Sequence, residues 1–184
     1  MPAHLWWLWD IYPRIVVVYG TSGEVEANKT AAERFNRDSL GLAPEVIKAD
    51  TDVNDADLKT ECIILIGRPE TNQIAEKLKD IFPIQFDRDK FTCQGTTYAR
   101  PTQAVAQIVE NPDGAHNLII LCAGLSPEAT QGFPYQSMGR SDRSYAIFDG
   151  DKQLLAGDWE DVDADLYWSA DSRASSGSVS GPAQ

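Results

Sequence analysis

Three short apolar runs, each ending beside a glycine, constrain the fold of this chain more than any other feature. They are residues 14–20 (RIVVVYG), 61–67 (ECIILIG) and 117–122 (NLIILC), the last followed by Ala123 and Gly124. The runs are rich in valine, isoleucine and leucine without polar alternation, which is typical of parallel strands covered on both faces. Because polar and then helix-like segments follow the runs, the pattern predicts an α/β domain.

The segments after the first two runs have the spacing of amphipathic helices. In residues 24–39 apolar side chains recur every three or four positions, and Gly41 and Pro44 end the pattern. A second helix is predicted to open at Pro69 or Thr71. The predicted apolar positions are Val25, Ala31, Ala32 and Phe35 in the first helix, and Ile74, Leu78, Ile81 and Phe82 in the second.

The other apolar segments are short and predict strands joined by turns. Residues 44–50 (PEVIKAD) predict a second short strand, and residues 83–99 predict a hairpin inserted between α/β units. Residues 104–109 (AVAQIV) fit a strand or a short helix, and the tight NPDG connection favours a hairpin partner for the strand at 117–122. A terminal hairpin is predicted around the DGD turn at 149–151. These elements predict a Rossmann-like or flavodoxin-like three-layer sandwich, with a mostly parallel sheet and antiparallel hairpin additions.

Composition argues against several classes of partner. The chain has 184 residues, enough for one domain of ordinary size, with 42% hydrophobic and 24% charged residues. Its net charge of −12 and its isoelectric point near 4.5 argue against binding to nucleic acid or to an anionic membrane surface. The sequence has no run of about 18 apolar residues, so no membrane span is predicted.

The sequence divides into three predicted parts. Residues 1–13 form a Trp-rich segment, residues 14–168 form one α/β domain, and residues 169–184 are expected to be a disordered tail because their few apolar residues cannot offset the entropic cost of ordering. Three tryptophans within four positions of the first segment indicate a contact with this domain or a neighbouring one. That segment lacks the basic region and the cleavage site of a signal peptide.

The predicted ligand site lies at the carboxyl ends of the parallel strands, where open α/β sheets bind ligands. Glycine-led polar corners at residues 20–23, 67–72 and 123–126 are expected to bring backbone N–H groups and hydroxyl groups together there. Arg68 is the one positive charge among them and the expected partner of an anion. The candidate ligand-binding residues are Thr21, Ser22, Arg68, Thr71, Asn72, Gly124 and Ser126.

The corners carry no diagnostic motif for a nucleotide or another cofactor. The stretch GTSGEVEAN fits neither GxGxxG nor the P-loop pattern. Glu24 and Glu26 open the next helix, where they suit the helix dipole but repel a bound phosphate. A plain β–α corner with a helix N-cap is therefore the simpler interpretation, and no cofactor is predicted.

Hydrolytic and metal chemistry lack support in the sequence. There is no GxSxG nucleophile elbow, and only His4 and His116 are available as a base. There is no CxxC pair, and the acidic connector at residues 50–61 lacks the spacing of a calcium loop and is expected to be a solvated face. No catalytic residue and no metal ligand is predicted. Cys62 and Cys122 are expected to be buried free thiols, with a contact between them left open.

The order of motifs resembles a known family. The succession IVVVYGTSG, AERF, IKADTDV, ECIILIGRPETNQIAEKLKDIFPIQFD, TYARP, ENP and NLIILCAG resembles a C-terminal domain of large bacterial serine hydrolases, namely multidomain esterases and prolyl-oligopeptidase-type peptidases. The resemblance covers residues 14–168 and is most specific in IKADTDV, LIGRPETN and the ENP turn. It implies a Rossmann-like accessory domain, a hydrolase catalytic domain or another protein surface as its partner, an exported or periplasmic location, and a strand at residues 104–109.

Three functions follow as hypotheses. The first is a non-catalytic accessory or interaction domain associated with a bacterial hydrolase. The second is a small-molecule or nucleotide-binding domain that uses the strand-end glycine corners. The third is a stand-alone hydrolase, which lacks a base in a plausible position.

Overall fold

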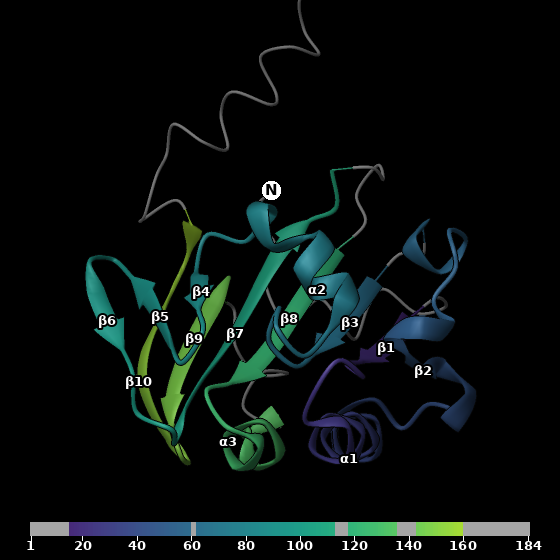
Figure 1. Ribbon diagram of the computed structural model, residues 1–184, viewed down its shortest axis with the longest axis horizontal. Coiled ribbons are helices and arrows are strands. Elements are labelled where there is room, and N and C mark those ends of the chain that lie inside the picture. Colours follow the sequence, from purple (N-terminus) through teal and green to yellow (C-terminus); the bar gives the residue numbers. More distant parts are fainter. Residues whose placement is uncertain (1–14, 60–61, 113–117, 136–142, 160–184) are drawn as a thin grey trace, which may run out of the picture.

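A seven-stranded mixed sheet forms the centre of the molecule, with the strand order β10-β9-β7-β8-β3-β1-β2 (Figure 1). The computed structural model describes residues 15–59, 62–112, 118–135 and 143–159. The strands of this sheet are β1 (Ile15–Tyr19), β2 (Ile47–Ala49), β3 (Cys62–Ile66), β7 (Gln103–Glu110), β8 (Leu118–Gly124), β9 (Tyr145–Asp149) and β10 (Lys152–Gly157). The chain is thus an α/β protein, as its three apolar runs predict.

The parallel half of the sheet consists of β2, β1, β3 and β8. Its register aligns the predicted apolar runs, since Val17 of β1 lies beside Ile64 of β3, and Ile64 lies beside Ile120 of β8. All three of these residues are fully buried, in agreement with strands covered on both faces. Because these strands run in the same direction, the glycine corners that follow them lie at one edge of the sheet.

The other half of the sheet is antiparallel, so the expectation of a mostly parallel sheet is wrong. Strands β7, β9 and β10 account for three of the six pairings, all of them antiparallel. Residues 104–109 form part of β7 and pair with β8, which confirms the predicted hairpin partner. Strands β9 and β10 confirm the terminal hairpin, with a register shift between Gln153 and Leu155. Two of these pairings, β7–β8 and β9–β10, join strands that are neighbours along the chain, as antiparallel strands can be.

A separate three-stranded sheet contains β4 (Gln85–Asp87), β5 (Lys90–Cys93) and β6 (Thr96–Tyr98). Strands β5 and β6 confirm the predicted hairpin, whereas β4 has no counterpart among the predicted elements. The residue before β4 is tied to the large sheet through Gln107 of β7. The Gln107 side chain accepts from Ile84 N at 3.0 Å and donates to Ile84 O at 2.9 Å, and it is fully buried. This tertiary contact leaves no local signal in the sequence.

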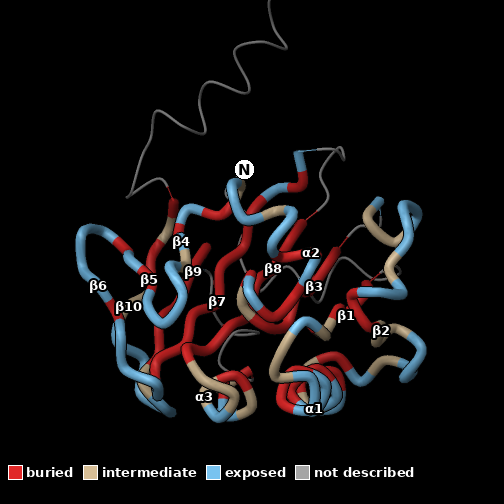
Figure 2. Tube along the Cα trace, in the orientation of Figure 1, coloured by how far each residue is buried: buried red, intermediate tan, exposed pale blue. Residues whose placement is uncertain are grey.

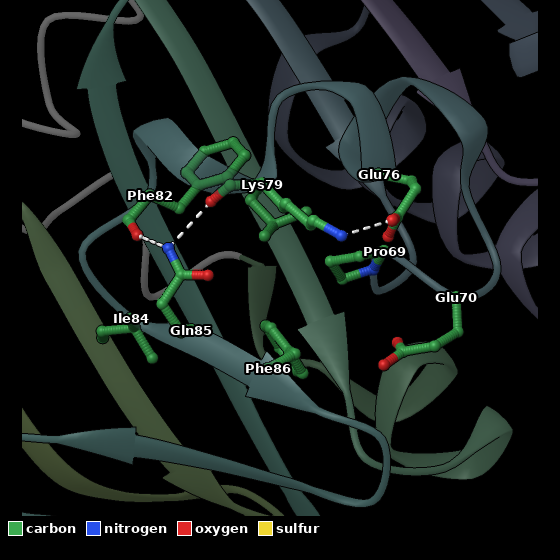
Figure 3. Close-up of a pocket in the computed structure, with 9 residues that line it drawn as sticks. Pro69, Glu70, Glu76, Lys79, Phe82, Ile84, Gln85 and Phe86 are labelled. Atoms are coloured by element: carbon green, nitrogen blue, oxygen red, sulfur yellow. Dashed lines mark hydrogen bonds and ion pairs between the residues drawn. The ribbon is translucent and has the colours of Figure 1, made fainter.

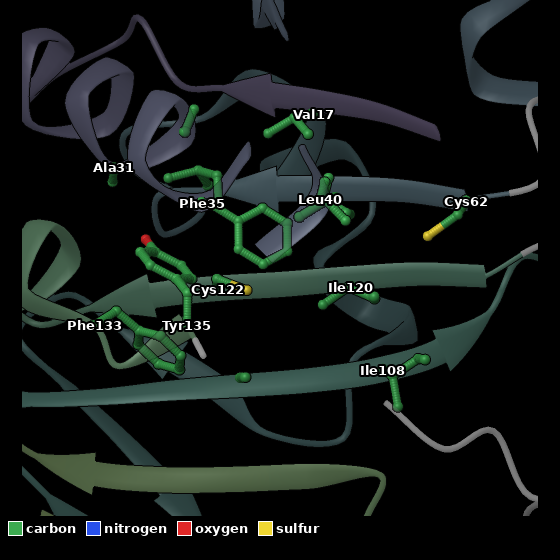
Figure 4. Close-up of a cluster of buried hydrophobic side chains, with 14 of the residues drawn as sticks. Val17, Ala31, Phe35, Leu40, Cys62, Ile108, Ile120, Cys122, Phe133 and Tyr135 are labelled. Atoms are coloured by element: carbon green, nitrogen blue, oxygen red, sulfur yellow. The ribbon is translucent and has the colours of Figure 1, made fainter. Parts of the chain in front are cut away.

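Two hydrophobic clusters cover the faces of the large sheet, and a third lies against the small sheet. On one face, Phe35 of α1 (Val25–Phe35) packs with Phe133 and Tyr135, and the Phe35 and Tyr135 ring centroids are 5.1 Å apart (Figure 4). On the other face, the buried residues of α2 (Gln73–Lys77) pack with the strands. Figure 2 shows that the buried residues follow the central strands, while the outer turns are exposed. The third cluster includes Phe91 of β5 and Trp159.

The helices differ from the predicted ones in detail. Helix α1 buries Ala31, Ala32 and Phe35 as expected, but Val25 is 39% exposed. A π-helical turn, η2 (Asn36–Leu40), extends α1 up to Gly41, whose φ of 64° ends the helix as predicted. Short 3-10 turns, η3 (Pro44–Val46), η4 (Asp50–Asp52) and η5 (Asp57–Lys59), lie in the segments around β2.

Helix α2 is shorter than its apolar pattern indicates. It has five residues, and its N-cap is Asn72, not Pro69 or Thr71. Of the predicted stripe, Ile74 and Phe82 are buried, whereas Leu78 and Ile81 are only partly buried and lie beyond the α-helix. The chain continues through a 3-10 turn, η6 (Lys79–Ile81), toward β4. Helix α3 (Pro127–Gly132) follows β8.

The register of β3 and β8 decides the cysteine question. Cys62 lies beside Leu118 and Cys122 beside Ile66, so the backbones of the two cysteines are four residues apart along the strands, or roughly 13 Å. The contact that the sequence leaves open is therefore excluded, and both cysteines are buried and free of disulfides. Burial in the apolar sheet raises the pKa of Cys62 to about 12, so this thiol stays protonated at neutral pH.

Some predictions concern residues that the structure does not describe. The Trp-rich segment at 1–13, the tail at 169–184, His4 and His116 all lie outside the described ranges. Among the described helices, none is long and apolar enough to cross a membrane.

Candidate functional site

The structure brings the three predicted glycine corners together at the carboxyl edge of β1, β3 and β8. Ser22 N donates to Thr71 O at 3.1 Å, which joins the first corner to the second. The Arg68 guanidinium donates to Leu125 O at 2.7 Å, which joins the second corner to the third. Parallel strand direction therefore places these distant segments in direct contact.

Arg68, the predicted anion partner, already has a partner within the chain. Its guanidinium forms an ion pair with the Glu24 carboxylate, and the two side chains are only 15% and 16% exposed. A second carboxylate, that of Glu70, lies with Oε2 4.0 Å from Arg68 Nε. The positive charge that the sequence assigns to a ligand is thus neutralised by carboxylates of the protein.

Thr21 bonds to a buried carboxylate that the sequence places on a solvated face. Thr21 Oγ1 donates to Asp50 Oδ1 at 2.5 Å, and Gln73 N donates to Asp50 Oδ2 at 2.7 Å. Asp50 is only 3% exposed, which corrects the expectation of a fully solvated connector. The signal for it is positional, because Asp50 directly follows β2 and so lies at the same strand edge as the glycine corners.

Asn72 and Ser126 act as helix N-caps. The Asn72 side chain accepts from Ile74 N and Ala75 N at 3.0 and 3.1 Å, and it donates to Val18 O and Ile66 O at 3.2 and 3.1 Å. Ser126 Oγ accepts from Ala129 N at 3.1 Å. Both side chains satisfy N–H groups at the start of a helix.

The remaining predicted residues have different surroundings. Thr71 is buried, and its hydroxyl donates to Arg68 O at 3.2 Å. Gly124 packs so tightly on α3 that a Cβ there would lie 2.4 Å from Thr130 N. Ser22 is exposed. The predicted residues are therefore close in space, but most of their polar groups stabilise the corners themselves.

Asn28 is a part of the site that sequence reasoning does not identify. It is fully buried, and its Nδ2 donates to Gly20 O at 3.2 Å and to Gly23 O at 3.1 Å. Its Oδ1 has no hydrogen-bond partner, and neither does Oε2 of Glu24, which is also buried. A polar residue on the buried side of α1, beside Ala27 and Ala31, is the available sequence signal.

Glu24 combines a strained backbone with a desolvated carboxylate. Its φ of 53° and ψ of 32° lie in the left-handed region, which costs a residue other than glycine about 1–2 kcal/mol. Burial raises the pKa of Glu24 above 4.5, the Arg68 guanidinium lowers it, and the carboxylates of Glu128 and Glu70 raise it, with a net upward shift. A strained residue with a perturbed pKa in a strand-end corner marks a candidate functional position.

We expect Glu24→Gln to remove a component of stability that depends on pH. The folded-state pKa of Glu24 is raised above 4.5, so the protonated carboxyl group contributes to the free energy of unfolding. This contribution is fully present below pH 4.5 and is lost as the pH rises through the folded-state pKa. Denaturant unfolding across this range should show the wild type losing stability relative to Glu24→Gln as pH increases. Exposed Glu26 in the same helical turn provides a matched control through Glu26→Gln. A wild type that gains stability relative to Glu24→Gln with rising pH would contradict the assignment.

Two concave regions lie outside the corners. A small cavity of about 90 Å³ lies between α2 and β4, with Phe82 and Phe86 on its apolar side and Glu70 and Glu76 on its polar side (Figure 3). Its Glu76 carboxylate is paired with Lys79 at 2.6 Å. A wider open groove of about 690 Å³ follows α1 and β2, and its apolar residues include Tyr19, Leu42, Pro44 and Ile47.

Metal binding has no support within the described ranges, which contain no group of three His, Cys, Asp or Glu side chains placed to hold an ion. Several carboxylates of the acidic connector at 50–61 and of the terminal hairpin are bonded to other residues of the chain. Asp57 bonds to Lys48 Nζ at 2.6 Å, and Asp149 bonds to Thr102 and Arg100. Asp158 accepts from Ser144 N at 3.1 Å.

No protein-family model matches this chain, and no curated protein has a significantly similar sequence. The fold and the geometry of the strand-end corners are therefore the grounds on which function is proposed.

Proposed function

We propose that this chain is a non-catalytic interaction domain that works beside the catalytic domain of a bacterial serine hydrolase. The observation that carries the proposal is the engagement of the strand-end corners by contacts within the chain. Arg68 pairs with Glu24, Thr21 bonds to Asp50, and Asn72 caps α2. In an α/β enzyme these positions hold substrate or cofactor. Here their polar groups mainly stabilise the protein.

The family resemblance and the strand order also support this proposal. The parallel strands have the order β2-β1-β3-β8, which is the 2-1-3-4 order of a flavodoxin-like sheet. A Rossmann-like or flavodoxin-like accessory domain agrees with the resemblance to the C-terminal domains of large hydrolases. A similar fold predicts the architecture of a protein better than its activity, so an interaction role needs a binding experiment.

The test measures binding of the purified chain to a serine-hydrolase catalytic domain from the same organism. We expect crosslinking and binding measurements with the immobilised catalytic domain to detect a complex. We expect no ester hydrolysis by the chain alone. Leu42→Glu, in the groove beside α1 and β2, is expected to weaken the complex about tenfold if the groove forms the contact. Leu154→Glu is the matched control, because Leu154 is an exposed leucine on β10 at the opposite edge of the sheet. A chain that remains monomeric beside every such hydrolase would contradict the proposal.

A second candidate function is binding of a small molecule at the strand-end corners. The direct contacts between the three corners support it, because they converge at the position where α/β sheets hold ligands. A stand-alone hydrolase has less support, since Ser126 is used as an N-cap and Ser22 has no described base beside it. Thermal-shift measurements with nucleotides, flavins and phosphosugars test the second candidate.

A further inference from the structure

We propose that the Trp-rich segment at residues 1–13 packs into the open groove beside α1 and β2, whose volume is about 690 Å³. The segment lies outside the described ranges, and the described chain starts at Ile15. This inference goes beyond the proposed function, because it concerns a contact within one chain that forms with or without a hydrolase.

The groove leaves part of the hydrophobic core uncovered at the edge of the sheet. Tyr19, Leu42 and Ile47 line it, and each is only partly buried and packs against the cluster that contains Phe35. Pro44 adds an exposed apolar side chain. Strand β2 has β1 as its only neighbour among the described strands, so no further strand extends the sheet here (Figure 1). Contiguous exposed apolar surface of this kind is typical of a contact site.

The segment is attached close to the groove. Ile15 is the first residue of β1, and Val17 of the same strand lies beside Ile47 of β2. With about 3.3 Å per residue along a strand and about 4.8 Å between strands, the Cα atoms of Ile15 and Ile47 are roughly 8 Å apart. Trp9 precedes Ile15 by six residues, which span at most about 20 Å. The segment can therefore reach the groove while the described strands stay in place.

The spacing of the tryptophans matches the length of the groove. Lys29 and Arg37 both line the groove, and at 1.5 Å per helical residue they are roughly 12 Å apart along the helix axis. Trp6 and Trp9 are at most about 10 Å apart in an extended chain. Each indole that packs on the apolar residues of the groove can remove about 150–250 Å² from contact with water.

The charges of the groove also suit this segment. The groove is lined by two cations, Lys29 and Arg37, and by one carboxylate, Glu33, although the whole chain has a net charge of −12. Both cations are exposed, and a cation beside the face of an indole ring is attracted to it. Asp10 is the one carboxylate within residues 1–13. The segment therefore brings aromatic rings and one negative charge to a locally positive surface.

Covalent attachment favours this occupant over a separate molecule. A short tether gives the segment an effective concentration in the millimolar range at the groove. A second copy of the chain has no such advantage, and its net charge of −12 opposes association. The groove is thus expected to be filled from within the chain.

Nuclear Overhauser contacts in the full chain test the proposal directly. Single Trp→Ser substitutions at residues 6, 7 and 9 identify the indole signals of the segment. We expect contacts between these indole protons and the methyl groups of Leu42 and Ile47, and these contacts should be unchanged when the protein is diluted.

Chymotrypsin cleavage after the aromatic residues of the segment measures the same contact as a rate. Cleavage requires the segment to leave the groove, so its rate follows the open fraction. Leu42→Glu is expected to speed cleavage within residues 6–12 about tenfold, and Pro44→Glu about threefold. Leu154→Glu, at the opposite edge of the sheet, should change it less than about twofold. Pro44 is exposed, so its variant serves if Leu42→Glu alters the fold.

Each other outcome overturns the inference. Contacts that disappear on dilution would place the segment of a second copy in the groove. Indole contacts with another surface, or none in the purified chain, would exclude the groove as the site of the segment. Equal cleavage of the wild type and both groove variants would exclude it as well. Binding to the hydrolase domain is measured separately, so the proposed function and this inference can each fail alone.

Discussion

Gly20→Ala is expected to lower the free energy of unfolding by about 3 kcal/mol. A Cβ at residue 20 would lie 2.1 Å from Thr71 O and 2.8 Å from Asn72 Cα, and both are backbone atoms. Neither can shift easily, because Thr71 O accepts from Ser22 N and the Asn72 side chain bonds to β1 and β3. The clash would separate the first glycine corner from the second.

Denaturant unfolding followed by circular dichroism measures this effect. Gly23→Ala is the matched control in the same corner, because its Cβ would lie 3.6 Å from Thr71 Cγ2, an ordinary contact distance. We expect the control to change stability by less than about 1 kcal/mol, with stabilisation allowed through reduced freedom of the unfolded chain. Equal stability of Gly20→Ala and the wild type would show that the corners do not pack as described.

Asn72→Ala is expected to cost about 3 kcal/mol of folding stability. The substitution removes an N-cap and leaves Ile74 N and Ala75 N without their acceptor, and Ile74 and Ala75 are themselves buried. It also removes the donor to the carbonyl groups of Val18 and Ile66, which joins α2 to two neighbouring strands. One side chain thus satisfies a helix start and links it to the sheet.

Ser126→Ala provides the comparison for this prediction. Ser126 also caps a helix, but its side chain accepts a single bond, from Ala129 N. Its loss should cost about 1 kcal/mol, a typical value for an N-cap. Both variants are measured by denaturant unfolding under the same conditions. A cost for Asn72→Ala no larger than that for Ser126→Ala would mean that the bonds to β1 and β3 add nothing to stability.

The sequence by itself determined the elements whose signals are local. The apolar runs at β1, β3 and β8 identify buried strands, because a strand covered on both faces needs apolar residues at every position. The hairpins β5–β6 and β9–β10 also follow from turn residues between short runs. The α/β class is therefore encoded in patterns that span a few residues.

Tertiary structure alone decided the length of α2, the position of β4 and the equal division of the sheet into parallel and antiparallel pairings. Helix α2 ends after five residues despite a longer apolar pattern, and β4 depends on the buried side chain of Gln107 in a distant strand. Periodicity cannot reveal such effects, because they depend on contacts between residues far apart in sequence.

The candidate site shows the same division. Its location followed from the glycine corners, since parallel strands end at one edge of the sheet. Its chemistry did not follow, because the charge available to a ligand depends on which side chains pair within the chain. Arg68 was predicted as an anion partner from its position, but the fold pairs it with Glu24 and leaves acceptor atoms of Glu24 and Asn28 unpaired. Pairing between distant residues is a property of the folded chain, and so the tertiary structure decided which polar atoms of the candidate site are paired within the protein.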